Sequence, residues 1–179
     1  TNPEPGFLEG VQALCRNEGA VFIFDEMITG FRFGRGGAQE LFGVVPDLAT
    51  FGKGLANGYP LSAIAGREEI MGLMEDIFFS FTMGSEALSL AAASATIDKI
   101  SRNSVVDKLQ ESGIFLMEGL EQLIKLHEVG DIFQLSGHPS WSFVKVADVP
   151  PYSNWDIRTM YLQEMFAQGI LVLGTHNIS

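Results

Sequence analysis

Short apolar runs and helically spaced apolar positions alternate along the first hundred residues. Residues 7–18 carry apolar side chains at helical spacing, and 21–24 form an unbroken apolar run. Such a run predicts a strand buried on both faces, as in a parallel sheet. The other predicted elements here are strands over 46–51, 62–65 and 78–81, and a short helix over 67–74. This alternation predicts an α/β domain.

The pattern changes after residue 85. The Ala-rich segment 85–100 is apolar on most sides and predicts a buried helix, and 105–129 predicts a longer amphipathic one. Strands over 131–135, 141–146 and 170–173 and a helix over 155–168 follow. We expect a boundary inside the long helix, which separates an α/β piece, 1–106, from a smaller α+β piece, 107–179.

Composition limits the classes of function. The 179 residues include 11 Lys or Arg and 22 Asp or Glu, which gives a formal charge of −11. Because nucleic acid and anionic membranes would repel such a chain, we expect neither as a partner. Cys15 is the single cysteine and the three histidines lack paired spacing, so neither a disulfide framework nor a metal site is expected.

Lys53 is the most informative residue for chemistry. It stands between two glycines in an otherwise uncharged stretch from Asp47 to Arg67, and no other lysine occurs among the first 98 residues. A lysine in such surroundings is expected to be partly desolvated, which favours the neutral, nucleophilic amine. The alternative is an exposed lysine on a tight turn.

Asp25 ends the apolar run 21–24. In open α/β sheets ligands bind beyond the carboxyl ends of the strands, so Asp25 and Lys53 could share one pocket. A carboxylate and a nucleophilic lysine suit pyridoxal phosphate, whose aldehyde forms a Schiff base with the amine while the carboxylate keeps the ring nitrogen protonated. The alternative for Asp25 is a cap of the following turn. Its neighbour Glu26 is expected to face a structural partner.

Two phosphate-binding patterns were compared. Thr82 and Ser85 lie at the start of the helix predicted over 85–100, where a hydroxyl and free N–H groups can bind an anion. The alternative is that one of them is an ordinary helix cap. A nucleotide phosphate loop needs Gly-x-x-x-x-Gly-Lys followed by Ser or Thr, and Gly54 follows Lys53 instead. The sequence therefore disfavours a nucleotide-binding switch.

Four segments together resemble a known family. They are Pro5-Gly6-Phe7-Leu8-Glu9-Gly10, Phe24-Asp25-Glu26-Met27-Ile28-Thr29-Gly30-Phe31-Arg32, Gly43-Val44-Val45-Pro46-Asp47-Leu48 and Gly52-Lys53-Gly54. In this order they resemble the class III pyridoxal-phosphate aminotransferases, and most closely the glutamate-1-semialdehyde aminomutase branch. The resemblance is dense from Pro5 to Met71 and continues to about Ile100.

The resemblance implies a fold-type-I enzyme, a cytoplasmic homodimer with its active site at the subunit interface. It makes Lys53 the Schiff-base lysine and Asp25 the partner of the ring nitrogen. Met27 falls where the family has a β-branched residue packed on the cofactor ring, and Thr82 where a threonine reaches the phosphate from the neighbouring subunit. Residues 1–106 would then end a large domain with a mainly parallel sheet, and 107–179 would begin a small, truncated domain.

The implied function is amino-group transfer on a small amino or keto substrate, by transamination or by aminomutase chemistry. Gly84-Ser85-Glu86-Ala87 replaces the family's Ser-Gly-Asn-Pro, which favours a related enzyme over a strict aminomutase. Because family members are more than twice as long, the chain is expected to be an internal fragment that is inactive by itself. The alternative is a non-catalytic fragment or homologue that serves in assembly or binding.

Overall fold

The computed structural model describes residues 2–78 and 80–173. They divide into two compact units, one covering Pro3–Asp107 and one beginning at Lys108. The assignment of 1–106 and 107–179 to a large and a small domain stays a prediction. Each unit is described separately below.

The first unit is a small sheet with helices. Its elements are α1 (Phe7–Asn17), β1 (Ile23–Asp25), α2 (Ala38–Phe42), β2 (Leu48–Phe51), the 3-10 helix η1 (Lys53–Leu55), β3 (Ala63–Gly66), α3 (Glu68–Met71), the 3-10 helix η2 (Gly72–Asp76) and α4 (Ala87–Arg102). Within the described residues the sheet has the strand order β1-β2-β3. β1 pairs with β2 in parallel and β3 pairs with β2 antiparallel. The predicted α/β class is confirmed.

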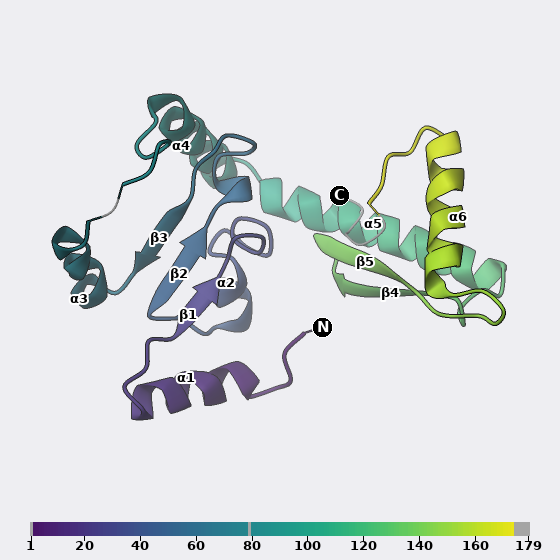
Figure 1. Ribbon diagram of the computed structural model, residues 1–179, viewed down its shortest axis with the longest axis horizontal. Coiled ribbons are helices and arrows are strands. Elements are labelled where there is room, and N and C mark those ends of the chain that lie inside the picture. The colour runs from purple at the N-terminus through teal and green to yellow at the C-terminus, as the bar shows by residue number, and fades with distance from the viewer. Residues whose placement is uncertain (1, 79, 174–179) are drawn as a thin grey trace. The chain divides into compact units, whose positions relative to one another are not determined.

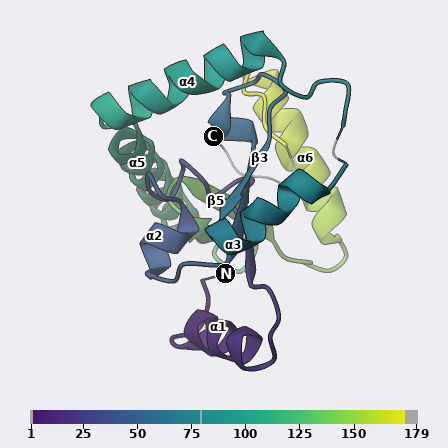
Figure 2. The same ribbon diagram turned by 90° about the vertical axis from the view of Figure 1, so that its left-hand side faces the viewer.

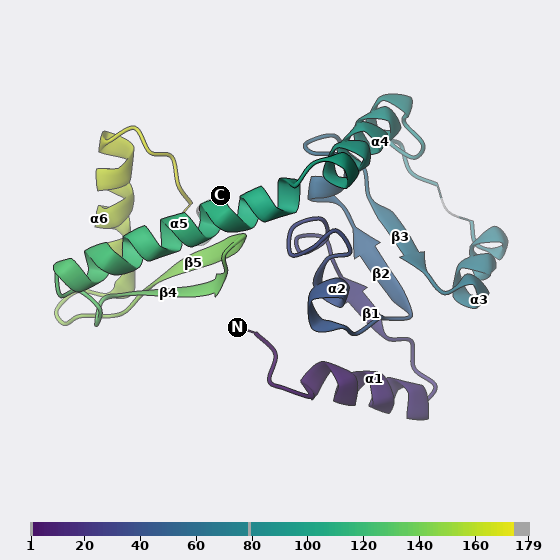
Figure 3. The same cartoon turned by 180° about the vertical axis from the view of Figure 1, so that it is seen from behind.

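The apolar core of this unit lies directly behind η1. Leu55 and Ala56 are buried against Ala93 of α4, and the partly buried Phe31 and Phe51 pack on them. In Figure 1, and from behind in Figure 3, the arrowheads of β1 and β2 point to the end of the sheet where α4 lies. Figure 2 shows α1 and α4 at opposite ends of this unit. The carboxyl ends of the two parallel strands therefore face the packed end, where η1 begins.

Burial differs from the sequence prediction in two elements. The run 21–24 was expected to be buried on both faces, but Phe22 is buried while Ile23 is 53% exposed. β1 lies at the edge of the described sheet and alternate side chains point to opposite faces, so one face packs and the other does not. In α4, Ser89, Ala93 and Ile100 are buried but Leu88 is 59% exposed, so the helix packs along one stripe.

Two predicted strands are not found. The described residues of 78–81 form no strand, and residue 79 lies outside the described part of the chain. Residues 170–173 follow the last helix without joining a ladder. Phe78, the first residue of this run, is 94% exposed. An apolar run becomes a strand only where a neighbouring edge supplies hydrogen bonds.

The second unit confirms the predicted α+β pattern. It contains most of α5 (Val105–Leu126), the antiparallel pair β4 (Phe133–His138) and β5 (Trp141–Val146), and α6 (Asn154–Ala167). Gly113 of α5 faces the β4–β5 turn so closely that a Cβ there would collide with the backbone of Pro139. The rings of Phe133 and Tyr161 lie 6.1 Å apart and join β4 to α6.

Candidate active site

Asp25 is the last residue of β1 and is paired in register with Thr50 of β2. Its Oδ1 accepts a hydrogen bond from the Met27 backbone N–H at 3.0 Å and one from Thr50 Oγ1 at 3.4 Å. The first of these is the turn-capping contact that the sequence offered as an alternative. Because both described bonds go to Oδ1, Oδ2 is the oxygen that can serve a ligand.

Lys53 opens η1 two residues after β2 ends, so it follows the strand next to the one that Asp25 ends. Because β1 and β2 are parallel, Asp25 and Lys53 lie at the same end of the sheet, where the carboxyl ends of these two strands meet. Lys53 has φ 46°, in the left-handed region that non-glycine residues rarely adopt. Such strain persists where the surrounding structure fixes it, and it is concentrated at functional sites.

The predicted desolvation of Lys53 is wrong for this chain. Lys53 and Asp25 are both exposed, and no described residue bonds the Lys53 side chain. Leu55 and Ala56, which follow it in the chain, are buried in the core, while Lys53 itself stays exposed. In this chain the residue therefore lies on a tight turn, as the alternative interpretation held.

The Met27 side chain lies against Gly52, the residue before Lys53. It is half-buried, and a Cβ on Gly52 would collide with its terminal methyl group. Met27 therefore packs on the backbone of the residue before Lys53. An apolar side chain placed beside the amine can contact a ring bound there, which is the role that the resemblance implies for it.

Glu26 points away from this edge into the interior and is 1% exposed. Its carboxylate accepts hydrogen bonds from the backbone N–H groups of Ala38 at 2.8 Å and Gln39 at 2.9 Å. The Thr29 hydroxyl donates a further, short bond to the same group. The expectation that Glu26 faces a structural partner is confirmed: it caps α2 and closes the loop between β1 and α2.

The N-terminus of α4 differs from both sequence interpretations. The Glu86 carboxylate accepts bonds from the N–H groups of Leu88 at 2.7 Å and Ser89 at 2.8 Å, and from the Ser89 hydroxyl at 2.6 Å. These bonds, led by that from the Ser89 side chain, lower the pKa of Glu86. Glu86, not Thr82 or Ser85, is the helix cap. These N–H groups are occupied, so the predicted anion site would need the Thr82 hydroxyl instead.

Thr82 lies in the turn before α4 and is exposed. No described contact joins it to Asp25 or Lys53 within this chain. Its assignment to a phosphate therefore stays a prediction, and it concerns a partner that this single chain does not contain.

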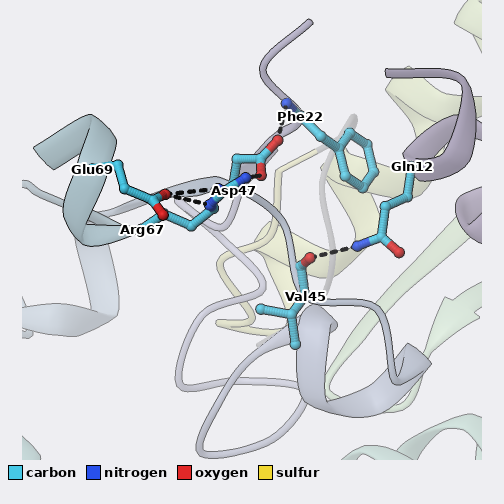
Figure 4. Close-up of polar contacts among 6 residues, drawn as sticks. All are labelled: Gln12, Phe22, Val45, Asp47, Arg67 and Glu69. Carbon is cyan, nitrogen blue, oxygen red and sulfur yellow. Dashed lines mark hydrogen bonds and ion pairs between the residues drawn. The ribbon is translucent and has the colours of Figure 1, made fainter. Parts of the chain in front are cut away.

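The opposite end of the sheet holds a second polar cluster, drawn in Figure 4. Asp47 accepts bonds from the Phe22 backbone N–H at 2.9 Å and from Arg67 at 3.0 Å, and Arg67 also pairs with Glu69 at 2.7 Å. The Phe22 bond and then Arg67 hold the pKa of Asp47 below its ordinary value. Beside this cluster lies a hollow of about 460 Å³ lined in part by Gln12 and Arg16, and Lys53 is not part of it.

Several of these partners were missed from the sequence. Thr50 and Arg67 bind carboxylates 25 and 20 residues away, so no local spacing identifies them. Glu86 was missed because Ser, Thr, Asp and Asn, and not Glu, are the residues preferred at an N-cap. The contacts of these carboxylates depend on which strands lie side by side, and the spacing of residues along the sequence does not reveal them.

Other chemistry is not supported among the described residues. They contain no group of three or more His, Cys, Asp or Glu residues arranged to hold a metal ion. Burial lowers the pKa of His138, whose Nδ1 accepts a bond from the Ser140 N–H, and His176 lies outside the described residues. None of the described helices has the length and apolar character needed to cross a bilayer.

Comparison with known proteins gives a consistent result. The sequence profile of the family described as "Aminotransferase class-III" matches residues 1–179. The chain is 36% identical to a glutamate-1-semialdehyde 2,1-aminomutase of Syntrophobacter fumaroxidans over 94% of its length. It is 33% identical to a 3-aminobutyryl-CoA aminotransferase of Cloacimonas acidaminovorans over 98% of its length. It spans 41% and 42% of these two relatives.

Solved structures agree with the sequence comparison. A structure described as the PLP internal aldimine form of the Sphingopyxis sp. MTA144 FumI protein matches with a TM-score of 0.90 and 28% identity. The match covers 99% of this chain and 42% of that one. The elements of this chain are therefore arranged as in a segment of that PLP-containing structure.

Proposed function

This chain belongs to the class-III aminotransferase family, and we propose that the whole protein transfers amino groups with pyridoxal phosphate through Lys53 and Asp25. The observation that carries the proposal is the placement of these two residues at the ends of adjacent parallel strands. The relative named as an aminomutase and the one named as an aminotransferase both support this class of reaction.

The residues present fit this cofactor. An amine and a carboxylate follow adjacent strands at the same end of the sheet, and the apolar Met27 side chain packs on Gly52, the residue before the lysine. An amine can bond to an aldehyde, a carboxylate can accept a hydrogen bond from a protonated pyridine nitrogen and so keep it protonated, and an apolar side chain can contact the ring face. When bound, pyridoxal phosphate supplies an electron-withdrawing ring that stabilises negative charge on the substrate carbon.

Each residue then has a defined task. When the cofactor is bound, the Lys53 amine would hold it, and the freed Nζ would serve as the general base that takes the α-proton. The Asp25 carboxylate would keep the ring nitrogen protonated, and within this chain its Oδ1 accepts bonds from the Met27 N–H and the Thr50 hydroxyl. The amino group would pass either to a separate keto acceptor, so that the donor ends as a carbonyl compound and the acceptor as an amine, or to the neighbouring carbon of the same molecule. Neither route needs an external oxidant.

The rest of the pocket is assigned to parts of the protein outside this chain. Since Lys53 and Asp25 are exposed here, we assign the exclusion of water to other segments of the whole protein and to a second subunit. A homodimer in which Thr82 reaches the partner's cofactor phosphate, located in the cytoplasm, follows from the family resemblance. In that assembly 1–106 belongs to the large domain and 107–179 to the small one. The substrate class is a small amino or keto compound.

Substitution of Lys53 tests the proposed function. Lys53→Arg in the full-length protein keeps the positive charge but removes the nucleophilic, proton-accepting amine, so amino transfer is expected to fall by at least ~10³-fold. Lys99→Arg is the matched control, because Lys99 is an exposed lysine of α4. Transfer is measured as keto product formed from a panel of amines with added pyridoxal phosphate. Full activity in Lys53→Arg would overturn the proposal.

A further inference from the structure

Glu26 is anchored on both its side chain and its backbone. The carboxylate binds Ala38 and Gln39, its backbone N–H donates to Thr50 O at 2.9 Å, and its carbonyl accepts from the Gly30 N–H at 2.9 Å. A buried carboxylate is costly unless its oxygens are satisfied, so these donors fix where the side chain lies. Glu26 is therefore among the most constrained residues next to the candidate site.

The loop after Glu26 is shaped to receive this carboxylate. A Cβ on Gly37 would lie 2.7 Å from the Glu26 Cδ, and one on Gly30 would lie 2.7 Å from the Glu26 carbonyl oxygen. Gly37 also has φ 76° and ψ −152°, a conformation that is essentially restricted to glycine. Two glycines of the Gly-rich stretch thus leave the space that Glu26 occupies.

The orientation of Glu26 determines the orientation of its two neighbours. Successive side chains along extended backbone point to opposite sides. With Glu26 held in the interior, Asp25 at the end of β1 is exposed, and the turn that begins at Met27 carries the Met27 side chain onto Gly52. A rotation of this segment that released Glu26 would move Asp25 and Met27 together.

We propose that Glu26 is a positioning residue of the amino-transfer site, whose buried carboxylate holds Asp25 and Met27 in place beside Lys53. This inference rests on the proposed function, because it gives Glu26 its task through two residues assigned to the cofactor. Glu26 itself contacts neither cofactor nor substrate. It acts through the turn that follows β1.

The test compares Glu26→Gln with Glu40→Gln in the full-length protein. Glutamine keeps the shape of Glu26 but places an NH₂ group against a backbone N–H donor. Glu40 is the matched control, since its exposed carboxylate also closes this loop, by accepting from the Gly36 N–H at 2.8 Å. Two quantities are measured: amide hydrogen exchange of Ala38 and Gln39 without cofactor, and the dissociation constant and absorbance titration of bound pyridoxal phosphate.

We expect Glu26→Gln to speed exchange at both amides, weaken cofactor binding by about tenfold, and shift the pH midpoint of the cofactor absorbance. Glu40→Gln should leave the cofactor measurements unchanged. Faster exchange in Glu26→Gln with unchanged binding and absorbance would show a purely structural residue and overturn the proposal. If Glu26→Gln does not fold, Glu26→Asp is used instead, because the shorter side chain withdraws the carboxylate from Ala38 and Gln39, and unchanged cofactor measurements in that variant overturn the proposal equally. A wild-type protein that never bonds the cofactor at Lys53 would instead overturn the proposed function, and this inference with it.

Discussion

At the Lys53 end of the β1-β2-β3 sheet, the Glu26 carboxylate is 1% exposed and is held by backbone N–H groups and a hydroxyl. At the opposite end, the Asp47 side chain is 25% exposed and is held by the Phe22 N–H and by Arg67, whose side chain is 57% exposed. Water and mobile side chains can replace contacts at the Asp47 end but not at the Glu26 end. The end of the sheet that carries Asp25 and Lys53 is therefore fixed by buried hydrogen bonds. The other end is held by partly exposed contacts that water can replace.

Gly37→Ala should disrupt the contacts of Glu26 and lower the stability of the protein more than any of the following substitutions. The new methyl group meets the Glu26 carboxylate and the backbone leaves its glycine-specific conformation, so the free energy of unfolding should fall by about 3 kcal/mol. Denaturant unfolding of the full-length protein measures this. Gly43→Ala is the control, because Gly43 has φ 67° but open space around it, and it should lose only about 1 kcal/mol. Equal losses in the two variants would mean that the Glu26 contact adds nothing.

Asp47→Asn should have a smaller, pH-dependent effect at the opposite end of the sheet. The pKa of Asp47 is lowered in the folded protein by the Phe22 N–H and by Arg67. Its contribution to stability is therefore complete above the unfolded value of about 3.9 and is lost as the pH falls through the lower folded pKa. The difference in thermal midpoint between wild type and Asp47→Asn should be present at pH 7 and shrink below about pH 4.

A matched substitution separates this effect from general surface charge. Asp98→Asn removes an exposed i,i+4 partner of Arg102 in α4, where the ion pair spans 3.3 Å. It should leave the midpoint nearly unchanged across the same pH range, since such pairs contribute little. A pH-independent difference for Asp47→Asn would argue that its carboxylate is not bound in the way that Figure 4 shows.

Elements of secondary structure could be predicted from the sequence more reliably than their surroundings. The spacing of apolar residues identified α1, the long helix α5 and the pair β4–β5, because that signal is local. Burial was wrong for Ile23 and for Leu88 of α4, since exposure depends on what packs against an element and not on its own residues. The strand predicted over 170–173 is wrong for a related reason: no described strand pairs with these residues.

The candidate site was predictable only in part. Asp25 and Lys53 could be singled out because each follows a predicted strand, but their placement at one edge required the parallel pairing of β1 with β2. The partners of Glu26 at Ala38 and Gln39 lie 12 and 13 residues away, across a loop whose path the sequence does not determine. The cap formed by Glu86 was overlooked in favour of hydroxyl residues beside it.

The central claim is that Lys53 forms the covalent bond to the cofactor. The most direct measurement is to saturate the full-length protein with pyridoxal phosphate, reduce it with borohydride and map the modified peptide by mass spectrometry. We predict a single label on Lys53, within the peptide Thr50–Asn57. A label on another lysine, with Lys53 recovered unmodified, would contradict the account.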